Sequence, residues 1–107
     1  MYTKKDVIKL MMEKFALSVE ADKLGEEAVL LYLEELDKQI ISAEVLEKLP
    51  DPIVFQTYVY NEKSEWIIGI AYKEGTDNPL FLVCVKDGVK VYEKILSKRI
   101  DNNGRAT

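Results

Sequence analysis

The spacing of apolar residues changes character near the middle of the chain. Before Pro50 the apolar residues recur every three or four positions, which is the period of a helix. After Pro52 they alternate with polar or small residues, which is the period of a strand. Proline ends a helix and favours an extended backbone just before it. The pattern therefore predicts an α+β protein with a helical half (1–49) and a sheet half (53–96).

Three helices, two long and one short, are expected in the first half. Thr3 can cap the first of them, and Asp6, three residues later, completes a near match to a capping box. Ser42 can cap the short one, which the two prolines then end. The helices are expected at residues 4–19, 25–40 and 43–49.

The second expected helix has apolar residues around much of its girth, which indicates packing on two sides. Its remaining surface is acidic. The acids are Glu26, Glu27, Glu34, Glu35 and Asp37. One interpretation is a solvated face, and the other is an acidic docking surface for a basic partner, including an inhibitor that mimics the charge of a nucleic acid.

Four strands are expected in the second half, at residues 53–60, 65–73, 80–86 and 89–96. Asp87-Gly88 is a strong hairpin signal, because both residues of such a turn must tolerate positive φ. Short turns join neighbouring strands in an antiparallel meander. We expect the helices to pack on one face of this four-stranded sheet.

The turn lengths predict which side chains share a face. A four-residue turn pairs Val59 with Trp66, and the Asp87-Gly88 hairpin pairs Cys84 with Val91. The bulky side of the 65–73 strand, which includes Trp66, should then lie under the helices.

The second face of the sheet is the predicted binding surface. It would contain Gln56, Tyr58, Tyr60, Ile67, Gly69, Ala71, Phe81, Val83, Lys90, Tyr92 and Lys94. Aromatic residues with a polar rim are typical of an interface, so we expect a homodimer or another protein partner there. A loop, the C-terminal tail or a further helix could instead cover this face within the monomer. Its tyrosines could also stack the bases of a single-stranded nucleic acid while its lysines hold phosphates.

Composition narrows the choice among these interpretations. The 107 residues, 48% of them hydrophobic, suit one domain at residues 1–96, followed by a polar tail at 97–107 that is expected to fray. The net charge of -4 argues against general nucleic-acid binding. A non-enzymatic interaction or self-associating domain is therefore the first hypothesis.

The sequence contains few residues that could act in catalysis or bind a metal. The chain has no histidine, which removes the usual general base and the commonest transition-metal ligand. The single cysteine, Cys84, falls inside a predicted strand and cannot form an internal disulfide. We expect no catalytic residue, no metal and no cofactor. A cytoplasmic location without a membrane segment is expected, because charges interrupt the apolar residues that follow Met1.

Overall fold

The computed structural model describes residues 2–96, which form an α+β fold around one antiparallel sheet of five strands in the order β1 to β5. The predicted tail at 97–107 lies outside the described residues. Two short 3₁₀ turns, η1 and η2, accompany the regular elements. In chain order these are α1 (Lys4–Phe15), η1 (Ala21–Lys23), β1 (Gly25–Leu31), η2 (Leu33–Glu35), α2 (Ala43–Leu46), β2 (Ile53–Asn61), β3 (Glu65–Lys73), β4 (Pro79–Lys86) and β5 (Val89–Ile95).

The capping box at the start of α1 is confirmed. The hydroxyl of Thr3 accepts from the backbone N–H of Asp6, and the Asp6 carboxylate accepts from the backbone N–H of Thr3. The helix ends at Phe15 instead of continuing to residue 19. Ala16 adopts a left-handed conformation with φ of 52°, which closes the last turn and redirects the chain.

The prediction of a long helix at 25–40 was wrong. Residues 25–31 form β1, which pairs with β2 in an unbroken antiparallel register from Gly25 opposite Val59 to Leu31 opposite Ile53. The pattern that suggested a helix with apolar residues all around it is also compatible with a strand, because successive side chains of a strand point to opposite faces. The short helix is present as α2, although it ends at Leu46 instead of residue 49. Its predicted cap is confirmed, because the hydroxyl of Ser42 accepts from the backbone N–H of the third helical residue.

The four strands predicted after Pro52 are all present, so the sheet has those four and β1. The bounds of β3 match the prediction, and the other three differ by one residue at one end. The turn between β4 and β5 has φ of 50° at Asp87 and 84° at Gly88, as the sequence predicts.

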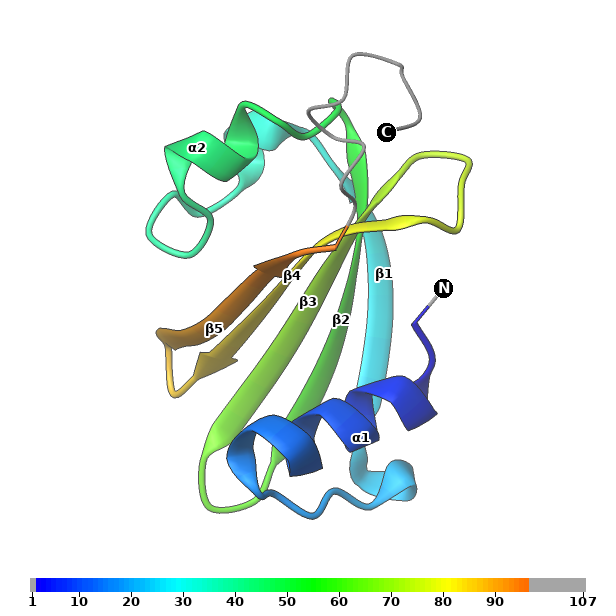
Figure 1. Ribbon diagram of the computed structural model, residues 1–107, viewed down its shortest axis with the longest axis vertical. Helices are drawn as coiled ribbons and strands as arrows, with labels where there is room; N and C mark the ends of the chain where they lie inside the picture. The colour runs from blue at the N-terminus through cyan, green and yellow to red at the C-terminus, as the bar shows by residue number, and fades with distance from the viewer. Residues whose placement is uncertain (1, 97–107) are drawn as a thin grey trace.

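Both faces of the sheet are partly covered. Figure 1 shows α1 across the end of the sheet near the β2–β3 turn, and the segment with α2 at the opposite end. The core on the α1 side contains Val7, Met11, Val19, Leu24, Tyr58, Tyr60, Trp66, Ile68, Ile70, Tyr72, Leu82 and Cys84. The core on the second side contains Leu36, Ile41, Val45, Leu49, Ile53, Ala71, Phe81, Val83 and Val85.

Two shifts of one residue separate the observed register from the predicted one. Trp66 pairs with Tyr60 instead of Val59, because the β2–β3 turn is one residue shorter than predicted. In the second hairpin a bulge leaves Tyr92 opposite Cys84. Because side chains alternate between faces, each shift moves a strand's side chains to the other face.

Candidate binding surfaces

The predicted binding face does not exist as one surface, because its residues are divided between the two sides of the sheet. The α1 side holds Gln56, Tyr58, Tyr60, Tyr92 and Lys94. The second side holds Ile67, Gly69, Ala71, Phe81, Val83 and Lys90. Five of these side chains are buried and closed to a partner, namely Tyr58, Tyr60, Ala71, Phe81 and Val83.

The bare place expected at Gly69 is filled by an aromatic ring. A Cβ atom at residue 69 would lie 2.4 Å from Cζ of Phe55, so the Phe55 ring occupies the space above the glycine. An apolar groove of about 300 Å³ adjoins the ring. Its lining includes Leu36, Ile40, Ile41, Ile67, Val83 and Val85. The segment between β1 and β2 covers another part of this side.

Buried tyrosines hold the start of the chain against the sheet. The backbone N–H of Tyr2 donates to the hydroxyl oxygen of Tyr72 at 3.0 Å, and the hydroxyl of Tyr58 donates to the carbonyl of Tyr2 at 3.4 Å. Burial, and secondly the carboxylate of Glu26, raises the pKa of Tyr58 to about 12. Tyr58 therefore remains a neutral donor that positions α1, and its ring is not exposed for stacking.

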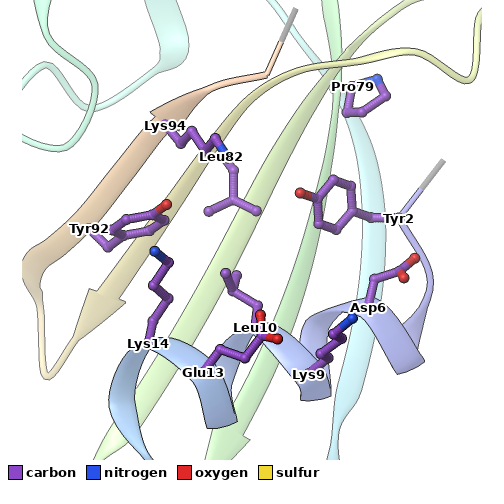
Figure 2. Close-up of a pocket in the computed structure, with 10 residues that line it drawn as sticks. All are labelled: Tyr2, Asp6, Lys9, Leu10, Glu13, Lys14, Pro79, Leu82, Tyr92 and Lys94. Carbon is purple, nitrogen blue, oxygen red and sulfur yellow. The ribbon is translucent and has the colours of Figure 1, made fainter.

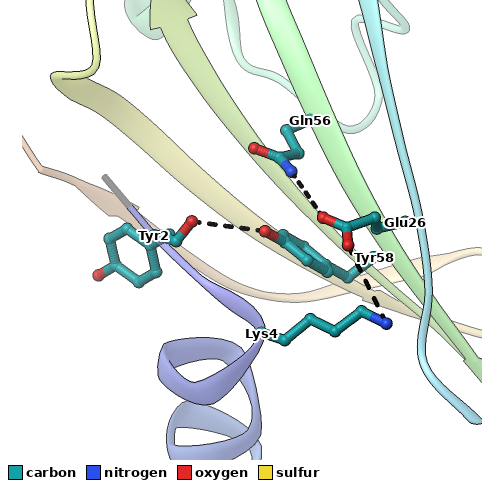
Figure 3. A network of polar contacts seen from close by, with 5 residues as sticks. All are labelled: Tyr2, Lys4, Glu26, Gln56 and Tyr58. Carbon is teal, nitrogen blue, oxygen red and sulfur yellow. Dashed lines mark hydrogen bonds and ion pairs between the residues drawn. The ribbon is translucent and has the colours of Figure 1, made fainter. Parts of the chain in front are cut away.

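The five acids predicted on one helix face lie instead on β1 and the turns after it. Figure 3 shows Glu26 accepting from the amide of Gln56 at 3.0 Å, with the amine of Lys4 4.0 Å away. Glu35 accepts from the backbone N–H of Tyr32, and Asp37 accepts from a backbone N–H two residues later. Glu27 and Glu34 are exposed. The helical arrangement was wrong: Glu26 and Glu27 lie on a strand at one edge of the sheet, and Glu34, Glu35 and Asp37 lie in the segment that follows it.

That edge is β1, which sequence reasoning missed. Within residues 2–96, β1 pairs with β2 alone, so the other side of its backbone is an open sheet edge. Its first six residues are exposed and its last is half-buried. Val29 and Leu30, which point to opposite faces, are 39% and 48% exposed. The run of apolar residues after Gly25 was the signal that could have indicated a strand.

A second hollow lies on the α1 side, between α1 and strands β4 and β5 (Figure 2). It combines Tyr92 and Lys94 with Lys9 and Lys14 of α1. The two helix lysines were not predicted as site residues. The helical spacing of Asp6, Lys9 and Glu13 could have indicated a polar stripe beside the core stripe.

The described residues provide little for catalysis. Cys84 is fully buried, and burial raises the pKa of its thiol to about 12, so it stays protonated and unreactive near neutral pH. Among residues 2–96, no three carboxylate or cysteine side chains are grouped so that they could hold a metal ion. Over the same residues, no helix combines the length and apolar character needed to cross a membrane.

Comparisons with protein families, with curated proteins and with solved structures found no match to this chain. The geometry and charge of the chain's own surfaces therefore carry the functional inference. The open surfaces of the described residues include the β1 edge, the apolar groove beside Phe55 and the hollow beside Tyr92.

Proposed function

We propose that this protein is a non-enzymatic interaction domain, and that the free edge of β1 binds an extended segment of another protein as a sixth strand. The supporting observation is that β1 is a regular, exposed edge strand of seven residues. An unpaired strand edge presents a row of backbone N–H and C=O groups, which is the template that added strands use.

The two edges of the sheet differ in their suitability for pairing. At β5 the register shifts at a bulge, and the strand carries Lys90 and Lys94. Bulges and edge lysines are the devices by which proteins prevent unwanted strand pairing. The pairing of β1 has no such shift, and the strand has no lysine. An added strand therefore meets fewer obstacles at β1 than at β5.

Charge indicates the chemistry of the partner. Residues 20–51, which include β1, contain ten acidic residues and three lysines, so their net charge is 3 − 10 = −7. Two copies paired through β1 would bring two such segments together, and like charges across an interface are unfavourable. A basic segment would instead be attracted. It would place positive side chains beside Glu26 and Glu27 and apolar ones beside Val29 and Leu30.

A labelled peptide tests this proposal. The probe is a ten-residue fluorescent peptide that joins a run of lysines to a run of valines, so that both faces of the added strand are basic beside Glu26 and Glu27 and apolar beside Val29 and Leu30. In the control peptide glutamate replaces lysine. We expect fluorescence anisotropy to show binding of the basic peptide alone, weakening as salt rises. We also expect slower hydrogen exchange of amides in residues 25–31, because strand addition protects backbone groups and simple ion pairing does not.

Matched variants locate the binding site. The double variant Glu26→Lys/Glu27→Lys should weaken the basic peptide at least tenfold. Glu44→Lys/Glu47→Lys, which makes the same change of charge on exposed positions at α2, should stay within about twofold. Equal losses in both variants, or unchanged exchange in β1, would refute edge binding. If the chain instead forms a dimer that Val29→Lys abolishes, and the peptide does not bind, the partner is a second copy.

A further inference from the structure

The hollow on the α1 side lies at the opposite edge of the sheet from β1 and has its own chemistry. Its volume is about 480 Å³, within the range of roughly 300–1,000 Å³ that is usual for small-molecule sites. Strands β4 and β5 form its floor and one wall, and α1 forms the other wall (Figure 2). Its lining residues are Tyr2, Asp6, Lys9, Leu10, Glu13, Lys14, Pro79, Leu82, Tyr92 and Lys94.

The fold places an aromatic ring and an apolar floor in this hollow. Leu82 lies beneath the hollow but is only 1% exposed, so the apolar surface that a ligand can reach belongs to the half-buried Leu10, Pro79 and Tyr92. Tyr92 is half-buried, and its ring packs edge-on against Phe15 with ring centroids 6.4 Å apart. The amine of Lys14 lies 5.3 Å from the centre of the Tyr92 ring. A flat apolar group can therefore contact Leu10 and Tyr92.

The charge in the hollow is positive on balance. Lys9, Lys14 and Lys94 make no ion pair within 4.0 Å to another described residue. Two acids oppose them. Asp6 is already held by Thr3, whose backbone N–H and hydroxyl donate to its carboxylate at 2.8 and 3.0 Å, and Glu13 is exposed. Three lysine amines thus surround the hollow, with one carboxylate that is not engaged in capping.

Tyr2 adds a neutral donor to the same wall. Burial, and secondly the carboxylate of Asp6, raises the pKa of its hydroxyl. The hydroxyl therefore keeps its proton near neutral pH. Its place is fixed because the Tyr2 backbone is bonded on both sides to buried tyrosines.

We propose that this hollow binds a small anion attached to an aromatic ring, of the class of aryl phosphates and mononucleotides. Lys14 and Lys94 hold the anionic group, since lysine amines form charge-assisted hydrogen bonds with phosphate oxygens. The aromatic ring packs on Leu10 and against Tyr92. An inorganic anion would contact only the lysines, and an uncharged ring would contact only the apolar residues. Neither of them uses both halves of the site.

Three probes separate the two halves: phenyl phosphate, inorganic phosphate and phenol. Titrations followed by amide NMR shifts should show phenyl phosphate perturbing residues 9–14, 82 and 92–94, with at least tenfold tighter binding than either other probe. Lys14→Gln/Lys94→Gln should weaken phenyl phosphate at least tenfold. Lys38→Gln/Lys48→Gln, which removes the same charge from exposed positions outside the hollow, should change it less than twofold.

Other results would overturn the proposal. Equal affinity for inorganic and phenyl phosphate would reduce the site to general charge attraction, as would equal losses in the two double variants. Shifts outside the hollow would place the ligand elsewhere. Unchanged unfolding curves, followed by the fluorescence of Trp66, establish that the glutamine variants remain folded. The site does not depend on binding at β1, so each proposal can fail without the other.

Discussion

Replacing Gly69 with alanine tests whether the ring of Phe55 takes the place of a side chain in the middle of β3. The new Cβ atom would lie 2.4 Å from Cζ and 2.9 Å from Cε2 of Phe55, closer than such atoms approach in proteins. The ring must move, and overpacking of this kind costs about 1–3 kcal/mol. Glycine inside a strand is itself about 0.5–1 kcal/mol less favourable than alanine. We expect Gly69→Ala to lower the free energy of unfolding by about 1 kcal/mol.

The sign should reverse when the ring is absent. Phe55→Leu removes the atoms that the new Cβ would meet, so alanine at residue 69 should then stabilise the protein by about 0.5 kcal/mol. The two substitutions would be coupled by roughly 1–2 kcal/mol. Urea unfolding of the four proteins, followed by the fluorescence of Trp66 on the other face, measures this coupling. An equal effect of Gly69→Ala in both backgrounds would refute the ring-over-glycine packing.

Two further predictions concern the buried hydroxyl and thiol groups. Cys84 and Tyr58 are neutral when folded because their pKa values are raised from 9.0 and 10.0 to about 12. Their contribution to stability is therefore complete below pH 9 and is lost as pH rises toward 12. The urea concentration at the unfolding midpoint should decrease as the pH is raised from 8 to 11, and it should decrease less steeply in Cys84→Ala. A midpoint that does not change over this pH range would contradict the prediction. Tyr72→Phe removes the acceptor for the Tyr2 N–H and should cost about 1 kcal/mol. Tyr32→Phe, which removes a hydroxyl at a 52% exposed position, should leave the free energy of unfolding almost unchanged. Equal losses of stability for the two variants in urea titrations would contradict the hydrogen bond between Tyr2 and Tyr72.

Local chemistry accounts for the parts of the fold that could be predicted. The capping box of Thr3 and Asp6 and the cap at Ser42 were found because each involves residues three positions apart. The Asp87-Gly88 turn follows from the backbone freedom of those two residues. The bounds of β3 follow from a long alternating run between polar residues. None of these features needs a distant contact to be recognised.

The segment that became β1 illustrates the limit of local reasoning. Glu26, Glu27, Ala28 and Leu30 all favour a helix by intrinsic propensity. The structure instead uses this segment to extend the sheet, since its seven residues pair with β2 in an unbroken register. Pairing of this kind depends on residues some thirty positions away in the chain, as in the bond between Gln56 and Glu26. Tertiary pairing outweighed the helical preference of the segment.

The positions of the open surfaces depended on details finer than the strand bounds. A turn one residue shorter than predicted put Tyr58 and Tyr60 under α1, and a single bulge turned Tyr92 and Lys94 toward the same helix. The first shift buried two of the three tyrosines that were expected to face a partner. The second brought Tyr92 and Lys94 beside the lysines of α1 and so assembled the hollow. A strand prediction that is correct to within one residue thus leaves open which side chains a sheet presents. Turn lengths and bulges decide which side chains lie on each face, and packing between the strands sets both.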